Sequence, residues 1–524
     1  MKARKVYIPV LLAAVIAASS VQALDVDSLL VASVGGPEAV DSLRHLRSIR
    51  VEGTVDVNGM QGEFEQLFVA PDRFYVKINF GMFSVVQAFD GKIAWQTGIN
   101  GQTAIMEGFE KRELLKGLYF DSYSFLFPDR LPGGKEYVGD TVIENRPFHV
   151  VAFYPLEKDT VLAFLDPETG LLEIMTTRLD NFDAIQYSDD YRIVSGVRLA
   201  FHVKIVAAEA GLTSEVTVKR VKANPRVDPS KFSMPGGRAA DFTFPPQTEA
   251  VRIPFEYHGG HIRAPVQING REKAGFVLDS GSSANFLHKA ISDRLRLPVV
   301  GTLPVRGLGG FQEVALVKID SLRVGELTLY DQVAGSADLG ALERNLGSDE
   351  PFGGLLGYDF LSRFPVLVNY RESTLTIFNP ARFNPPEGGT EVPFHLTMSI
   401  PTVHGELNGI PGDYIIDLGN ALGLIVHHGF ATAHELETKL DDVRDNAEAL
   451  HGVGGGVADK NAFAASFRIG DILIQSLRVI LPESTTGIAG SEELAGNIGN
   501  MILENFDILF DYQHGRLIFY GADN

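Results

Sequence analysis

Two aspartates, at positions 279 and 417, each follow an apolar segment and begin a glycine-containing turn. The segments read Val-Leu-Asp-Ser-Gly at 277–281 and Ile-Ile-Asp-Leu-Gly at 415–419. Glycine permits backbone conformations and close approaches that a Cβ atom would block. Two neighbouring carboxylates cannot both ionise, so they share one proton. The ionised partner can accept a proton from water while the protonated partner polarises a carbonyl group. The pair therefore predicts amide hydrolysis without a metal or a nucleophilic side chain.

The second half of the chain repeats itself, which explains how the two aspartates can meet. Residues 354–378 align with residues 496–520 at a shift of 142 positions. Glycine-rich segments at 307–310 and 452–455, and the two Asp-x-Gly turns, recur upstream in the same order. We interpret this pattern as an internal duplication of two β-rich lobes. If the lobes pack around a pseudo-twofold axis, both turns lie at that axis.

The motifs of the first repeat follow one another as DSGSSANFL at 279–287, GLGGF at 307–311 and LLGYDFL at 355–361. This order resembles that of retropepsin-type aspartic proteases. In that family the Asp loop carries the catalytic carboxylate, a glycine-rich hairpin forms a flap over the substrate, and the apolar-Gly segment supports the Asp loop. The resemblance implies catalytic roles for Asp279 and Asp417 and a peptide or protein substrate.

The same resemblance assigns supporting roles to three further groups of residues. The Asp loops are completed by Ser280, Gly281, Ser282, Leu418, Gly419 and Asn420. The flaps and substrate contacts comprise Gly307, Leu308, Gly309, Gly310, Gly452, Val453, Gly454 and Gly455. The loop-supporting residues are Leu356, Gly357, Ile498 and Gly499.

The second lobe departs from the family pattern at the residue after the aspartate. Family loops usually carry a hydroxyl there, which bonds across the axis and stiffens both loops. Ser280 can make this bond, whereas Leu418 cannot, and the amide of Asn420 could disturb or replace part of the network. We expect a hydroxyl restored at position 418 to raise activity or leave it unchanged. The alternative is a non-catalytic periplasmic protein that binds peptide or lipid, a pseudoprotease or carrier, and carboxylates that point apart would favour it.

The first half of the chain has a different pattern. Two short helices are predicted at 26–34 and 38–46, followed by a nine-residue apolar-polar alternation at 49–57. Strand-like runs separated by turn signals continue to about residue 221, which predicts a long antiparallel meander with a concave apolar face.

Segments 89–95, 165–171 and 190–197 are similar to the strand signatures of periplasmic lipoprotein-carrier (LolA-like) half-barrels. This resemblance implies a β half-barrel over 24–235 and allows a lipid or acyl ligand in it.

The predicted fold class is therefore mainly β. A half-barrel of one curved antiparallel sheet with short helices precedes a pseudo-twofold, two-lobed aspartic-protease unit. The predicted organisation is a signal peptide at 1–23, the half-barrel at 24–235, a Pro- and Gly-rich linker at 236–250, and lobes at 251–385 and 386–524.

Residues 1–23 have the pattern of a secretory signal peptide. Three cations precede an apolar run at 6–18, and small residues stand at 21 and 23. The run is too short to span a bilayer comfortably, and no transmembrane segment is expected after its removal. The 524 residues contain no cysteine, which excludes disulfides, thiol nucleophiles and thiolate metal sites. Export without disulfides suits a bacterial periplasm or exterior.

The charge balance and the histidines exclude other functions. With 46 Lys and Arg against 66 Asp and Glu, the net charge of −20 argues against nucleic acid as a partner. His427, His428 and His434 could suggest a metal, but His434-Glu435 lacks the second histidine of a zinc helix. We therefore expect neither a metal nor a cofactor.

Overall fold

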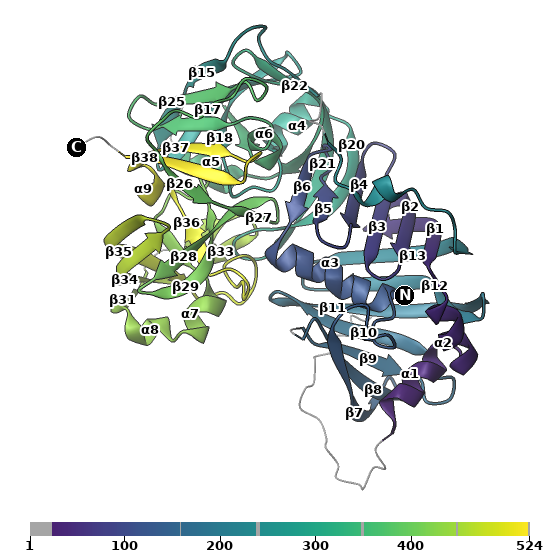
Figure 1. The fold of residues 1–524 in the computed structure, drawn as a ribbon. Helices are drawn as coiled ribbons and strands as arrows, with labels where there is room; N and C mark the ends of the chain where they lie inside the picture. Colours follow the sequence, from purple (N-terminus) through teal and green to yellow (C-terminus); the bar gives the residue numbers. More distant parts are fainter. Residues whose placement is uncertain (1–23, 158, 237–240, 347–350, 447–448, 522–524) are drawn as a thin grey trace.

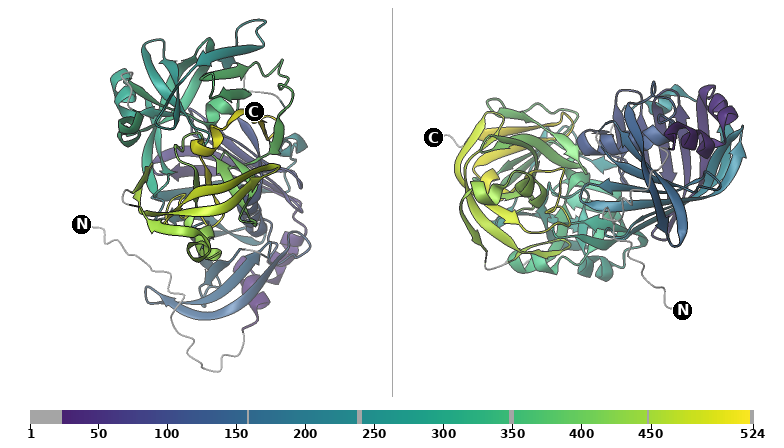
Figure 2. Two further views of the ribbon diagram at one scale, coloured as in Figure 1. Left: turned by 90° about the vertical axis from the view of Figure 1, so that its left-hand side faces the viewer. Right: turned by 90° about the horizontal axis from the view of Figure 1, so that it is seen from below.

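A computed structural model describes residues 24–157, 159–236, 241–346, 351–446 and 449–521. The predicted signal peptide at 1–23 lies outside these residues. The fold is mainly β, as predicted, and the chain arranges it as a curved sheet beside two β lobes (Figure 1). In Figure 2, the view from below shows the curved sheet on the right and the lobes on the left.

The N-terminal sheet is an antiparallel meander whose strand order is β6 to β1, then β13 down to β7. The antiparallel pair of β1 with β13 joins the two runs of strands. Its sharp turns use residues that tolerate positive φ, as at Asn58-Gly59 between β1 and β2 (φ 50° and 87°). The strands are β1 (Ser48–Val57), β2 (Met60–Val69), β3 (Arg73–Asn79), β4 (Ser84–Phe89), β5 (Ala94–Thr97), β6 (Thr103–Met106), β7 (Gly133–Ile143), β8 (Arg146–Pro155), β9 (Val161–Leu165), β10 (Leu172–Leu179), β11 (Phe182–Val194), β12 (Val197–Ala207) and β13 (Leu212–Ala223).

Three helices pack on this sheet: α1 (Val26–Val34), α2 (Pro37–Arg44) and α3 (Gly108–Asp121). The sequence predicted the first two and missed α3. Leu114 and Leu118 of α3 pack against Phe68 and Phe89 of the sheet. The helix therefore fills much of the concave apolar face that the strand pattern predicts. A cavity of about 350 Å³ remains beside it, with apolar walls from β3 and β4 and with Tyr358 and Ser399 of the lobes at its border.

Each lobe has its own sheet. In lobe 1 the order is β14-β22-β19-β23-β18-β17-β21-β20, with β16 beside β17. Its elements are β14 (Phe242–Thr243), β16 (Glu256–His258), β17 (His261–Ile268), β18 (Glu272–Leu278), β19 (Phe286–His288), α4 (Lys289–Leu295), β20 (Val299–Arg306), β21 (Phe311–Val324), β22 (Leu327–Ala337), α5 (Gly340–Leu346), β23 (Phe352–Leu356) and α6 (Tyr358–Leu361); the 3-10 helix η1 (Pro229–Phe232) precedes the lobe.

Lobe 2 has the order β27-β28-β29-β36-β30-β35-β34-β31, with a separate hairpin of β32 and β33. Its elements are β27 (His395–Thr397), β28 (Ile400–Leu407), β29 (Ile410–Ile416), β30 (Leu424–Val426), α7 (His428–Ala433), α8 (Leu436–Lys439), β31 (Asp441–Asp445), β32 (Leu450–Gly452), β33 (Gly455–Val457), β34 (Asp459–Ile469), β35 (Ile472–Pro482), β36 (Gly496–Ile498) and α9 (Asn500–Leu503).

A further sheet joins the lobes, with the order β15-β25-β24-β37-β38-β26. Its strands are β15 (Ala250–Pro254), β24 (Val366–Asn369), β25 (Thr374–Phe378), β26 (Thr390–Pro393), β37 (Phe506–Asp511) and β38 (Arg516–Gly521). The central antiparallel pair, β24 with β37, sets Leu367 opposite Leu509. These two residues are 142 positions apart, the same shift that aligns the sequence repeat. A twofold axis through this pair requires that register, because each residue then faces its own repeat equivalent.

Residues 241–250, the greater part of the segment predicted as a linker, contribute regular structure. Within it β14 pairs with β22, and the carboxylate of Asp241 accepts hydrogen bonds from the buried guanidinium of Arg363. Burial of the Arg363 side chain makes this ion pair a fixed attachment rather than a loose surface contact.

The half-barrel touches lobe 2 through Glu110 of α3. The Glu110 carboxylate accepts a hydrogen bond of 2.8 Å from the backbone N–H of Met398, in the turn between β27 and β28. Burial raises the pKa of Glu110 to about 7, although the Met398 N–H and Gln96 act in the opposite direction. The contact therefore makes the stability of the domain junction depend on pH.

Replacement of Glu110 by Gln should remove that dependence. Because the folded-state pKa is raised, wild-type stability falls as pH rises from about 4.5 to about 7, and Gln has no charge to bury. The variant should gain about 2 kcal/mol over wild type between pH 5 and pH 8. Urea unfolding at both pH values measures this, with the exposed Glu107→Gln as control. An equal difference between wild type and E110Q at both pH values would contradict the burial of this carboxyl group.

Candidate active site

Equivalent strand pairs position the two aspartates. Asp279 follows β18, which runs parallel to β23, and its N–H donates to the carbonyl of Leu356 at 2.9 Å. Asp417 follows β29, which runs parallel to β36, and its N–H donates to the carbonyl of Ile498 at 2.9 Å. The residues predicted to support the loops therefore contact the aspartates directly.

The glycines that follow these supports have no room for a side chain. A Cβ atom on Gly357 would lie 2.2 Å from the carbonyl oxygen of Ala284, and one on Gly499 would lie 2.3 Å from that of Leu422. Each supporting segment is thereby packed directly against the backbone of its Asp loop.

Each carboxylate lies across the glycine of the opposite loop. A Cβ atom on Gly281 would lie 2.3 Å from the carboxyl carbon of Asp417, and one on Gly419 would lie 2.5 Å from that of Asp279. This reciprocal contact is possible only because both positions are glycine. The two carboxylates thus face each other across the pseudo-twofold axis rather than pointing apart.

The surroundings of Asp279 favour the protonated form of its carboxyl group. Burial raises the pKa of Asp279 well above its ordinary value, and the charge of Asp417 and a hydrogen bond to it act in the same direction. The N–H groups of Gly281 and Ser282 oppose this shift but do not reverse it. Asp417 is surrounded differently, since its carboxylate accepts from the Gly419 N–H at 2.8 Å and from Nδ2 of Asn497 at 2.6 Å.

Asn497 is a site residue that the sequence motifs did not indicate. Its Oδ1 accepts from Nδ2 of Asn420 at 2.9 Å, so Asn420 orients the amide that holds Asp417. Oδ1 of Asn420 in turn accepts from the Leu422 N–H. The residue 142 positions before Asn497 is Leu355, whose apolar side chain offers lobe 1 no equivalent amide. An unusual Asn one position before the loop-supporting Ile-Gly was the signal available in the sequence.

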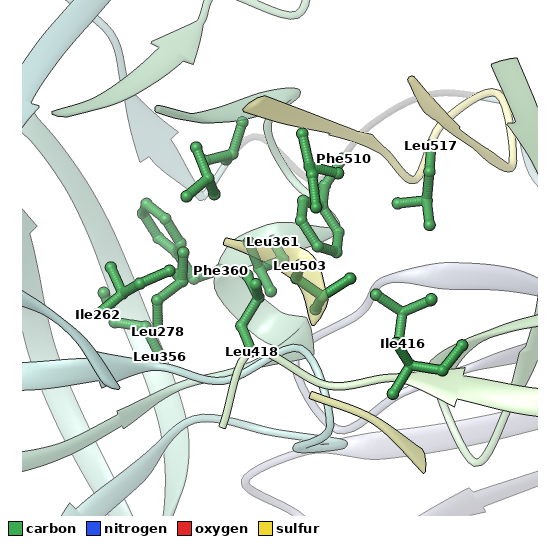
Figure 3. Packing of buried hydrophobic residues seen from close by; sticks show 14 of the residues in the cluster. Ile262, Leu278, Leu356, Phe360, Leu361, Ile416, Leu418, Leu503, Phe510 and Leu517 are labelled. Atoms are coloured by element: carbon green, nitrogen blue, oxygen red, sulfur yellow. The ribbon is translucent and has the colours of Figure 1, made fainter. Parts of the chain in front are cut away.

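Ser280 bonds across the axis, whereas Leu418 cannot return the bond. The Ser280 hydroxyl donates to the carbonyl of Ile416 at 2.7 Å and accepts from the Leu418 N–H at 2.9 Å. The Leu418 side chain is fully buried and belongs to the main apolar core together with Leu361 and Leu503. Figure 3 shows it among these residues, beneath the short helices that support the two loops.

Another amide supports the Asp417 loop from behind. Nδ2 of Asn500 donates to the carbonyls of Leu418 and Gly260, both at 2.7 Å, and its Oδ1 accepts from the Tyr370 hydroxyl. The Asp279 loop has a different support, because the Gly357 N–H donates to the side chain of Asn285 at 2.9 Å. The two loops are therefore equivalent in backbone but not in side-chain support.

The two glycine-rich turns that were predicted as flaps meet each other. A Cβ atom on Gly307 would lie 2.1 Å from the carbonyl oxygen of Val453, and one on Gly454 would lie 2.6 Å from that of Gly310. Val453 also packs against an apolar cluster of lobe 1 that includes Val277, two residues before Asp279. The glycine-rich turn of each lobe thus reaches the opposite lobe.

Two histidines of this region are buried. His427 is fully buried, burial lowers its pKa to about 4, and its Nδ1 lies 3.2 Å from the carbonyl oxygen of Leu494. His261 is also buried, which lowers its pKa, while the charge of Asp417 raises it. In the part of the chain that the structure describes, no cluster of three or more His, Asp or Glu side chains is arranged to hold a metal ion.

Comparison with known proteins relates lobe 1 to one family. Residues 264–360 match the family model described as aspartyl protease, so this region, which contains Asp279 and the first glycine-rich turn, is aspartyl protease-like. No curated protein matches the chain. Lobe 2 lies outside the family match, so its part in the site rests on the geometry given above.

Similar solved structures include two bacterial proteins. One is a DUF1329 family protein from Desulfovibrio piger, with 10% identity over 39% of this chain and 95% of that chain and a TM-score of 0.29. The other is a putative outer membrane lipoprotein-sorting protein domain from Vibrio parahaemolyticus, with 8% identity, the same coverage and a TM-score of 0.30. Among the described residues, no helix is long and apolar enough to cross a membrane.

The burial of Leu418 predicts a loss of stability when a hydroxyl is placed at that position. Leu418→Ser deletes core volume and buries an unpartnered hydroxyl, so it should destabilise the fold by about 3–4 kcal/mol. Leu418→Met, which conserves volume, should cost less than about 1.5 kcal/mol. Urea unfolding of both variants tests this, and equal stability of Leu418→Ser and wild type would show that the side chain does not pack in the core.

Asp279→Asn should change the pH dependence of stability. A carboxyl group whose pKa is raised by folding favours the folded state less as pH rises through the range between its ordinary and its raised pKa. The variant has no carboxyl group at position 279 and does not lose stability in this way. The difference in urea unfolding midpoint, variant minus wild type, should therefore increase from pH 4 to pH 8. An unchanged difference across that range would mean that Asp279 is not buried beside a second charge.

Proposed function

We propose that the chain is an exported aspartic endopeptidase that hydrolyses peptide bonds with water activated between Asp279 and Asp417. The observation that carries this proposal is the reciprocal contact in which each carboxylate lies over the glycine of the opposite loop. Export is proposed from the cationic and apolar pattern of residues 1–23, with the bacterial periplasm or exterior as the destination.

The two carboxylates divide the chemistry between them. Asp417, held by the Gly419 N–H and by Asn497, accepts a proton from the attacking water. Asp279 donates its proton to the carbonyl oxygen of the scissile peptide as the water oxygen bonds to the carbonyl carbon. The resulting tetrahedral intermediate expels the amine, which takes a proton from Asp417, and the remaining hydroxyl returns a proton to Asp279. The pair ends with one shared proton, as it began.

The Asp417 loop does not need a hydroxyl at position 418 in this scheme. The relay from Asn420 through Asn497 fixes the Asp417 carboxylate, and the hydroxyl of Ser280 already links the two loops in one direction. These contacts favour catalysis over the pseudoprotease alternative. Each oxygen of Asp417 has a hydrogen-bond donor, whereas a site that had lost its function would be expected to lose part of this network.

Replacing either aspartate by asparagine should abolish peptide hydrolysis, with kcat/KM falling at least about 10³-fold. Wild-type activity should be bell-shaped in pH: it falls as pH rises through the raised pKa of Asp279, and it falls in stronger acid once both carboxylates are protonated. A mixture of unstructured peptides analysed by mass spectrometry across pH 3 to 8 measures both effects.

Asp293→Asn, on the exposed face of α4, is the matched control and should retain full activity. Undiminished cleavage by Asp279→Asn would refute the proposal, as would a rate that peaks above neutral pH. If wild type cleaves no peptide but binds peptide or lipid, the alternative of a binding protein would replace it.

A further inference from the structure

One turn of the half-barrel reaches deep into the protease unit. Asp180 and Asn181 connect β10 to β11, and Asp180 adopts a positive φ of 54° that a short polar side chain tolerates. The Asp180 carboxylate accepts from Nη2 of Arg306 at 2.7 Å and from the Ser491 hydroxyl at 2.8 Å. Its other oxygen accepts from two backbone N–H groups, at 492 and 493.

This turn contacts the flap of lobe 1, residues 307–310, at the base of its hairpin. Arg306 ends β20 and Phe311 begins β21, and the two residues pair immediately below the glycine-rich tip. Arg306 is bound by Asp180 in an ion pair whose side chains are only 10% and 3% exposed. Phe311 packs edge-on against Phe182 of β11, with ring centroids 5.2 Å apart. The half-barrel therefore contacts both strands of the flap hairpin.

The same turn also fixes the segment of lobe 2 on which the flap tip rests. Nδ2 of Asn181 donates to the carbonyls of Thr485 and Gly487, each at 3.0 Å. The N–H groups of Ile488 and Ala489 donate to the carbonyls at 307 and 308 of the flap, at 2.9 and 3.0 Å. Flap, lobe 2 and half-barrel thus form one connected contact around Asp180.

From these contacts we propose that Asp180 is a positioning residue for the protease flap, supplied by the half-barrel. The inference rests on the proposed function, in which the flap covers a peptide above the two aspartates. A flap held closed before substrate arrives spares the substrate the free energy of closing it. A covered site also excludes water, which strengthens the electrostatic effect of each carboxylate.

Asp180→Asn is the direct test. Asparagine keeps the shape of the side chain but loses its charge. All partners of the Asp180 carboxylate are hydrogen-bond donors, so the NH₂ group of asparagine would face donors and leave them unpaired. We expect faster deuterium uptake at residues 306–311, measured by mass spectrometry, and a rise in KM of about tenfold with kcat changed less than about threefold. Arg178→Gln is the matched control, since the Arg178–Glu492 pair lies at the same junction but is about half exposed. It should change neither quantity.

Arg306→Lys provides a second variant if Asp180→Asn folds poorly. Lysine keeps the charge but, as a single ammonium group, cannot reproduce the contacts of Nη2 with Asp180, Asn181 and Gly487. It should shift uptake and KM in the same direction by a smaller factor. Together, Arg306→Lys and Asp180→Asn should raise KM no more than Asp180→Asn alone.

The outcomes separate this inference from the proposed function. If wild type is inactive, the proposed function of the aspartate pair is contradicted. Deuterium uptake at 306–311 then still tests whether Asp180 holds the hairpin. Unchanged uptake in Asp180→Asn would refute the positioning role. A rise in kcat/KM would also refute it, because the turn would then obstruct substrate rather than prepare the flap.

Discussion

The site depends on the space between two carboxylates and two glycines. Each Asp side chain occupies the volume that a Cβ atom on the opposite glycine would take, so neither loop can change without displacing the carboxylate of the other. This mutual exclusion brings two acidic groups close enough to share a proton, and burial raises the pKa of Asp279. The parallel strand pairs, the short supporting helices and the joining sheet all serve to hold this contact.

Symmetry of backbone and asymmetry of side chains coexist in this arrangement. The backbone bonds to Leu356 and Ile498 are equivalent, whereas the groups around each carboxylate differ. Asp417 has the Asn497 amide, and Asp279 has no equivalent because position 355 is a leucine. Ser280 bridges the loops by hydrogen bonds, while Leu418 stabilises the same region by packing. A two-lobed single chain can assign acid and base roles to different halves, because each half carries its own sequence.

The sequence indicated much of this architecture, and physical reasons explain what it did not indicate. The aspartates, glycines and apolar strands are local signals, so the β class and the two N-terminal helices could be predicted. Helix α3 lacks an apolar face with regular spacing, because it is enclosed by a curved sheet and contacts it along several sides. Asn497, Asp180 and Arg306 gain their roles from contacts between residues far apart in the chain. Leu418 looked like a defect in a polar motif, but the surrounding core, which a motif does not reveal, makes it a packing residue.

The sheet that joins the lobes has a further consequence. Because β24 and β37 belong to one polypeptide, the two Asp loops meet through an intramolecular event whose effective concentration does not depend on how much protein is present. A site of this kind built from two separate chains disassembles on dilution, whereas this one does not. The covalent link also lets each lobe diverge without producing mismatched pairs. In dilute solution, assembly of the aspartate pair then depends on folding alone.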